Sequence, residues 1–393
     1  LCACLVGSEM CIRDRNNPEK ETGSVYGIVD LYTNYLASRI GFIQSVKLLK
    51  LIISSLWDHL VEPRRQLMAV KSLKLLQKCH YADYVEGALS SAFIEEKDIS
   101  RCLVVLELLW NQLEPNSAVL RRPVELMADE LFDEQNPHYL SVSKWILSVV
   151  NSGSSNRLFY LLTDDLLKFD FLKRDYLQDL DDLDMFTYRL QCLTSILKSN
   201  NNVVLESFTT ELTTIGSLAD WENEDVSTYK NLVIVIIMRF LHLKNNNNAT
   251  SIRSALLLLE YLLNGSEQNF KWIVMFLLQM SSEYISKEGL ESDLIAVSLL
   301  NIVSKVLRLS HENGIKLDVF DDNTTHLKYV DYLITSVASM ESPLIVTSYV
   351  KLLRESLAYF ESSIFRMILP LTASIVQCVH KLLDKEKKDG GYY

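Results

Sequence analysis

Cysteine is the residue type with the most obvious chemistry in this sequence, and three of the seven cysteines lie in the first fifteen residues, LCACLVGSEMCIRDR. Cys2, Cys4 and Cys11 could bind a metal ion or form disulfides. However, no second pair of ligands follows them at the spacing of a zinc site. The spacing of these cysteines therefore indicates no metal centre.

The same stretch is also unlike a secretory leader. Its apolar run covers only residues 1–6 and no basic residue precedes it, whereas a signal peptide has an apolar core of about 7–15 residues. The segment LVGSEMCIRDR resembles translated sequencing-adapter read-through. We therefore interpret residues 1–15 as a non-native leader, and we expect the native sequence to begin near Asn16.

The acidic segment LQDLDDLDMF is a second candidate for chemistry, with Asp179, Asp181, Asp182 and Asp184 close together. Clustered carboxylates can bind calcium, but the segment lacks the central glycine and the glutamate at the twelfth position of a calcium loop. Carboxylates are also stabilised by the positive end of a helix dipole. The segment therefore predicts the first turn of a helix.

None of the common catalytic motifs occurs in the sequence. There is no phosphate-binding loop, no GxGxxG, no HExxH and no GxSxG, and the seven histidines are scattered without ligand spacing. The cysteines beyond the leader are widely spaced, which is typical of buried free thiols; they are Cys79, Cys102, Cys192 and Cys378. We expect no catalytic residue, no metal and no cofactor.

Composition indicates a helical protein. The sequence has only 12 glycines and 7 prolines in 393 residues, and 48% of its residues are hydrophobic. A formal net charge of -11 is unlike that of nucleic-acid-binding domains, which are basic. The strongest candidate for a membrane span is the uncharged apolar run at residues 232–238, which ends at Arg239, well short of the roughly 20 residues that a membrane helix needs. This run predicts a buried helix.

Turn signals recur along the chain at intervals of roughly 15–25 residues, and apolar residues between them follow the period of a helix. One predicted face contains Trp145, Ile146, Val149 and Val150, and another contains Ile295, Leu299, Ile302, Val306 and Leu309. We expect helices to begin after Asn116 and Ser342, which are suited to cap them.

Antiparallel pairs of helices of about 20 residues each give a period near 40 residues, which is typical of HEAT and armadillo repeats. The predicted fold is all-α, an α-solenoid of antiparallel helix pairs, with helical repeats in residues 16–244 and C-terminal helical repeats in residues 251–389. The alternative is two separate helical bundles divided at KNNNNATS, residues 244–251.

Two surfaces could bind partners. A basic stretch with a net charge of +5 precedes an acidic one, and its basic residues are Lys47, Lys50, Arg64, Arg65, Lys71, Lys74 and Lys78. This stretch is either an ordinary solvated helix face or a surface for anionic lipid or an acidic partner. The second is a leucine-zipper-like seam with heptad spacing, formed by Val346, Val350, Leu353, Leu357, Phe360 and Ile364. It either packs on the following helix, around residues 368–379, or contacts another chain.

Three stretches resemble the Dopey family. They are RRPVELMADELFDEQNPHYLSVSKWILSVVNSGSSNRLFYLLTDDLL at residues 121–167, DMFTYRLQCL at residues 184–193, and LAYFESSIFRMILPLTASIVQCV at residues 357–379. The last resembles the family's leucine-rich C-terminal region. The resemblance covers roughly residues 120–380, so the chain is expected to be an inner-to-C-terminal piece of a longer protein.

The resemblance implies a non-enzymatic scaffold in vesicle-mediated transport, cytoplasmic and peripheral on Golgi and endosome membranes. The partners it implies are a large HEAT-type protein related to Arf exchange factors, an aminophospholipid flippase complex and a kinesin, with no nucleic acid. Two alternatives remain open. An importin-like transport receptor would have Trp and Asn pairs recurring at one helical position, which the five tryptophans do not do. A regulatory subunit of an enzyme complex is the other.

Overall fold

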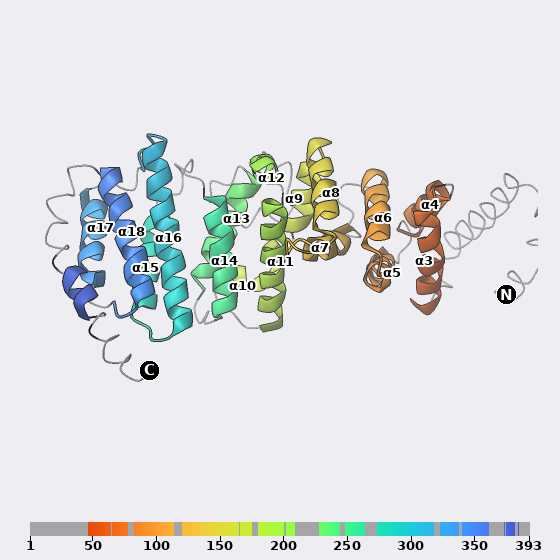
Figure 1. Cartoon of the computed structure of the whole chain (residues 1–393). Helices are drawn as coiled ribbons and strands as arrows, with labels where there is room; N and C mark the ends of the chain where they lie inside the picture. The colour runs from red at the N-terminus through yellow and green to blue at the C-terminus, as the bar shows by residue number, and fades with distance from the viewer. Residues whose placement is uncertain are drawn as a thin grey trace, which may run out of the picture. The chain divides into compact units, whose positions relative to one another are not determined.

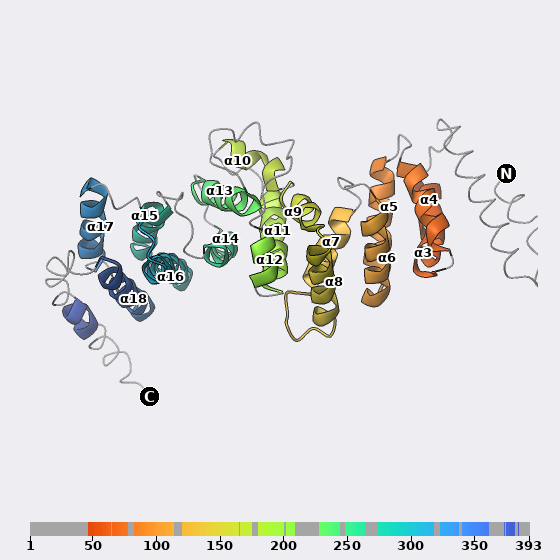
Figure 2. The ribbon, with the colours of Figure 1, turned by 90° about the horizontal axis from the view of Figure 1, so that it is seen from above.

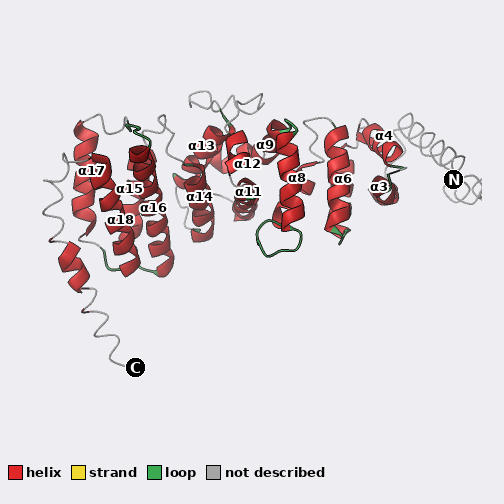
Figure 3. Cartoon of the chain, turned by 45° about the horizontal axis from the view of Figure 1, so that its top comes forward, coloured by secondary structure: helices red, strands yellow, loops and turns green. Residues whose placement is uncertain are grey.

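The computed structural model describes a chain of helices joined by loops (Figure 1). It describes residues 46–63, 65–77, 82–113, 120–164, 166–174, 180–199, 202–208, 228–243, 248–263, 273–317, 323–337, 340–360, 373, 375–381 and 384. Within these ranges every regular element is a helix and no strand occurs, as Figure 3 shows. The prediction of an all-α fold is therefore confirmed.

Contacts within the chain divide it into two compact units, residues 1–161 and 162–393. The boundary falls inside helix α9, Ser155–Thr163. The predicted division at residues 244–251 lies within the second unit, between helices α13 (Tyr229–Leu241) and α14 (Ala249–Leu262), which pack against each other.

The first unit consists of two rows of helices. Its helices are α3 (Val46–Val61), α4 (Gln66–Gln77), α5 (Ala82–Glu95), α6 (Ile99–Gln112), α7 (Arg121–Asp129) and α8 (Tyr139–Asn151). Helix α5 packs against α3 and α7, and α6 packs against α4 and α8, so that alternate helices are neighbours. This packing of each helix on the next but one is the arrangement of a helical solenoid, in which stacked pairs share one core.

The second unit follows the same arrangement from α14 onward. Besides α13 and α14, it contains α10 (Asp170–Arg174), α11 (Leu180–Lys198), α12 (Asn202–Ser207), α15 (Ile273–Ile285), α16 (Leu290–Glu312), α17 (Asn323–Ser336) and α18 (Pro343–Phe360). Helices α11, α14, α16 and α18 pack in succession in one row, and α15 packs on α17 in the other. Figure 2 shows the two rows from above, with α13, α15 and α17 on one side and α14, α16 and α18 on the other.

The predicted apolar faces form the core. Trp145, Ile146, Val149 and Val150 are all buried in α8, and four of the five predicted α16 residues are buried, with Leu309 half-buried. The apolar run 232–238 lies in α13 and is buried along its whole length. A helix that is apolar all round is stable in water only when other elements cover it on every side, as they cover α13.

Local polar signals also set the helix ends. Asp181 and Asp182 lie in the first turn of α11, as the acidic segment predicted. Helix α18 begins at Pro343 directly after Ser342, whereas Asn116 lies outside the described residues. The Asp98 carboxylate caps α6 by accepting hydrogen bonds from the backbone N–H groups of Ser100 at 2.9 Å and Arg101 at 3.4 Å.

The cysteines that the structure describes are free and buried, as predicted; they are Cys102, Cys192 and Cys378. Burial raises the pKa of the Cys102 thiol to about 11, so it stays protonated and unreactive at neutral pH. Cys79 and the leader, residues 1–15, lie outside the described residues, and the interpretation of the leader stays a prediction.

Substitutions in α16 test whether row packing stabilises the second unit. Leu299 is fully buried in this helix, which contacts α14, α15 and α18. We expect Leu299→Ala to lower the free energy of unfolding by about 2–5 kcal/mol, because it removes buried methyl groups and leaves a cavity. Urea denaturation followed by circular dichroism measures the change.

The matched control is Leu290→Ala, because Leu290 lies in the same helix but is 66% exposed. It should change the free energy of unfolding by no more than about 0.5 kcal/mol. Equal effects of the two substitutions would contradict the packing described here.

Candidate functional site

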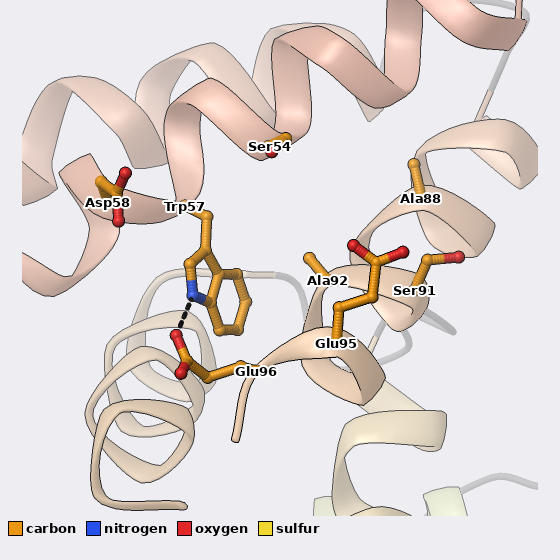
Figure 4. A pocket seen from close by; sticks show the side chains of 8 residues that line it. All are labelled: Ser54, Trp57, Asp58, Ala88, Ser91, Ala92, Glu95 and Glu96. Atoms are coloured by element: carbon orange, nitrogen blue, oxygen red, sulfur yellow. Dashed lines mark hydrogen bonds between the residues drawn. The ribbon is translucent and has the colours of Figure 1, made fainter. Parts of the chain in front are cut away.

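A small open pocket of about 230 Å³ lies in the first unit, between α3 and α5 (Figure 4). Its lining residues are Ser54, Trp57 and Asp58 from α3, Ala88, Ser91, Ala92 and Glu95 from α5, and Glu96 directly after α5. These residues recur three or four positions apart, so that each helix turns one face toward the hollow. The pocket thus combines an indole ring, two hydroxyls and three carboxylates.

Small side chains on α5 create the space. Ala88, Ser91 and Ala92 lie on the face of α5 that lines the hollow, opposite the large Trp57 of α3. In Figure 4 the Trp57 ring and the Glu95 side chain stand on either side of Ala92. Larger residues at the three α5 positions would fill the hollow.

Trp57 is fixed within the pocket wall. Its side chain is buried, its ring meets that of Phe93 edge to face with centroids 4.8 Å apart, and its indole N–H donates to Glu96 Oε2 at 2.9 Å. Such an edge-to-face pair stabilises by about 0.5–1.5 kcal/mol beyond area burial. The indole therefore presents a defined surface to the pocket.

Glu96, which lines the pocket from the α5–α6 loop, is held by polar contacts that include Arg101 of α6. The second carboxylate oxygen of Glu96 accepts the backbone N–H of Asp98 at 3.1 Å, and Arg101 contacts Glu96 at 3.2 Å and Asp58 at 2.9 Å. The hydrogen bond from Trp57, then that from the Asp98 backbone, and the nearby Arg101 charge hold the pKa of Glu96 below its ordinary value. Glu96 is therefore an ionised carboxylate at neutral pH.

Glu95 is the carboxylate of the pocket without such partners. It is exposed, and within the described residues it forms no hydrogen bond or ion pair. Arg101 compensates Asp58 and Glu96 in part, which leaves the pocket with an excess of negative charge. The sequence alone does not predict this site, because its signal is only the small-residue spacing in GALSSAF, residues 87–93, opposite a tryptophan.

The predicted basic surface is only partly described. Lys71 is exposed on α4, Lys74 is half-buried in the last turn of α4, and Arg65 is half-buried and paired with Glu62 at 3.3 Å. Of the other four, Lys47 and Lys50 lie in α3 without described side chains, and Arg64 and Lys78 lie outside the described residues. Use of this surface for lipid or an acidic partner stays a prediction.

The predicted seam lies along α18, at the edge of the buried face. Its residues differ in exposure: Val346 and Leu353 are buried, Leu357 and Phe360 are half-buried, Val350 is 44% exposed, and Ile364 lies outside the described residues. The seam therefore has one exposed member among the residues that the structure describes.

The centre of the buried face of α18 lies one position away from the seam. Ile345, Tyr349 and Leu352 are almost fully buried. Helix α18 packs chiefly on α16, the next helix but one before it in the chain. Tyr349 donates a hydrogen bond to the Leu333 carbonyl of α17, and this bond links α18 to α17. Contact of the seam with another chain, or with residues 368–379, stays a prediction.

The loop between α7 and α8, residues 130–138, is braced by its own side chains. The Asn136 side-chain amide donates to Glu130 at 2.9 Å, and its oxygen accepts the His138 backbone N–H at 2.9 Å. Asp133 accepts the Gln135 backbone N–H at 2.9 Å, so that short polar side chains stabilise successive turns. The segment DELFDEQNP, residues 129–137, begins at the last residue of α7 and covers most of this loop, with Phe132 47% exposed.

The described residues contain no cluster of three or more His, Cys, Asp or Glu side chains that could hold a metal ion. No helix in the described ranges is both long enough and apolar enough to cross a membrane.

Comparison with known proteins identifies the family. The chain is 59% identical over 378 residues to Protein DOP1 of Saccharomyces cerevisiae, an alignment that covers 96% of this chain. The chain belongs to the Dopey family. No family model and no solved structure matches the chain.

The aligned region is only part of the yeast protein. The chain spans 22% of the length of that relative, so the activity and partners of a whole Dopey protein do not transfer directly to it. The alignment includes nearly the whole chain and so extends well beyond residues 120–380, the part in which the sequence resemblance was found.

Two substitutions in α18 separate the buried and exposed parts of the seam. Leu353→Glu places a carboxylate at a 5% exposed position, so we expect it to lower the free energy of unfolding by several kcal/mol. Val350→Glu should change it by no more than about 0.5 kcal/mol. Urea denaturation measures both changes, and equal losses would contradict the observed exposures.

Light scattering of the folded Val350→Glu variant then tests the zipper hypothesis. A lower molar mass than that of the unsubstituted chain would support contact of the seam with another copy. An unchanged mass would exclude a second copy as the partner at this position.

Proposed function

We propose that this chain is a non-enzymatic scaffold in vesicle-mediated transport between the Golgi and endosomes, cytoplasmic and peripheral on those membranes. The observation that supports the proposal is the 59% identity to a Dopey protein over 96% of the chain. The lack of a catalytic motif in the sequence, together with the stacked helices of each unit, favours binding over catalysis.

The mechanism we propose is presentation of helix faces and loops to protein partners. A stack of helices buries its apolar faces between neighbouring helices and leaves an outer surface that is free to vary. Exposed apolar residues on such a surface, including Phe132 in the braced loop and Val350 on α18, are suited to contact other proteins. The partner proposed first is a large HEAT-type protein related to Arf exchange factors, followed by a flippase complex and a kinesin.

The positions of the three tryptophans that the structure describes disfavour an importin-like receptor. Such a receptor would present tryptophans along a groove, but Trp57, Trp110 and Trp145 are each at most 7% exposed. Trp110 and Trp145 meet edge to face with centroids 5.7 Å apart, and the Arg157 guanidinium lies 4.6 Å from the Trp110 ring. These tryptophans stabilise the core of the first unit.

Affinity purification of the tagged 393-residue chain from cytosol, followed by mass spectrometry, tests the proposal. We expect a HEAT-type relative of Arf exchange factors in the eluate. Ran with nuclear cargo would support the importin-like alternative, and a phosphatase or kinase would support the regulatory-subunit alternative. Either result without the HEAT-type protein would contradict the scaffold proposal.

The basic surface of α4 provides a separate test of membrane contact. We expect the double substitution of Lys71→Glu and Lys74→Glu to weaken binding to liposomes that contain phosphatidylserine, by about 1 kcal/mol for each lysine near the membrane surface. Co-sedimentation at low and physiological salt measures the binding.

The control for the liposome assay is Lys144→Glu, a reversal of charge at an exposed position on α8. It should weaken binding by less than half as much as the double substitution in α4 does. Binding that is unchanged by the α4 substitutions would exclude this surface as the site of membrane contact.

A further inference from the structure

The pocket between α3 and α5 has a composition that neither the family nor the proposed function explains. It is small, open, negatively charged and bordered by an indole ring. We propose that it binds a Lys or Arg side chain of a protein partner.

Charge determines the class of ligand. Asp58, Glu95 and Glu96 all line the hollow. Arg101 forms ion pairs with Asp58 and Glu96. An anion would face uncompensated carboxylates and is disfavoured. A cation that entered the pocket could form an ion pair with the Glu95 carboxylate, which is exposed and forms no hydrogen bond or ion pair within the described residues.

The walls favour a cation on a hydrocarbon stem over a bare ion. Ala88 and Ala92 offer methyl groups to the stem, and Trp57 offers part of its ring to the stem or to the cation itself. A metal ion would need converging ligands, yet the described residues contain no such cluster. Lys and Arg are the protein side chains with both a long apolar stem and a permanent positive charge.

Size and rigidity limit the ligand to one side chain. A hollow of about 230 Å³ has room for a single long side chain but is smaller than the roughly 300–1,000 Å³ of drug-sized ligand pockets. The Trp57 ring is held by Phe93 and Glu96, so the wall needs no rearrangement on binding. The pocket is therefore suited to anchor one basic residue of a peptide segment.

Fluorescence anisotropy with short labelled peptides tests this proposal on the 393-residue chain. One peptide carries two arginines in a glycine and serine background, a second carries lysines in their place, and a third carries citrulline, the neutral analogue of arginine. We expect the arginine and lysine peptides to bind and the citrulline peptide not to bind. Equal binding of all three, or binding of none, would overturn the proposal.

Three variants locate the binding. Glu95→Gln should weaken binding about two- to fivefold, the range expected for one exposed ion pair. Ala92→Leu keeps the charge but fills the hollow, so it should weaken binding more strongly. Glu107→Gln removes the same charge from an exposed position of α6 outside the pocket and should weaken binding less than Glu95→Gln. Thermal unfolding confirms that each variant is folded.

The remaining outcomes are equally decisive. If Glu95→Gln and Glu107→Gln weaken binding equally, the attraction is diffuse and the pocket is not the site. If phosphatidylcholine vesicles bind in a way that Ala92→Leu abolishes, while the peptides do not bind, the ligand is a lipid ammonium group and the proposal is wrong. Failure of the peptide test would leave the affinity-purification result, and with it the proposed function, unaffected.

Discussion

The packing of helices in two rows, in which a helix contacts its neighbours in the same row and a partner in the other row, is the constraint on which the rest of the structure depends. A single amphipathic helix cannot shield its apolar face from water, and a pair shields only the side between its two members. In the first unit α5 is covered by α3 and α7, and in the second α16 is covered by α14, α15 and α18. Burial of this apolar surface is the main source of stability, at about 25 cal/mol per Å².

The same constraint explains where functional features can arise. Core positions must be filled, so variation is confined to helix faces and loops that the rows leave open. The pocket arises where α5 places small residues opposite Trp57. Glu96 accepts the indole N–H of Trp57 and forms an ion pair with Arg101, so the polar groups beside the pocket have partners. Local choices of residue size and charge thus build a polar site without disturbing the rows.

The sequence predicts the core better than the surface. The apolar spacing of α8 and α16 and the acidic first turn of α11 are sufficient to predict the elements, because periodicity and dipole effects act within one helix. The pocket could not be predicted, because it depends on which faces of α3 and α5 meet. The seam illustrates the same limit: heptad spacing includes the exposed Val350 as readily as the buried Leu353.

The braced loop between α7 and α8 has a thermodynamic consequence for binding. Flexible loops lose conformational entropy when a partner orders them, and that loss weakens association. Here Asp133 and Asn136 already hold the turns in place through hydrogen bonds to Gln135 and His138. A partner that contacts Phe132 would meet a preorganised surface, and most of the favourable energy of its contacts would appear as affinity.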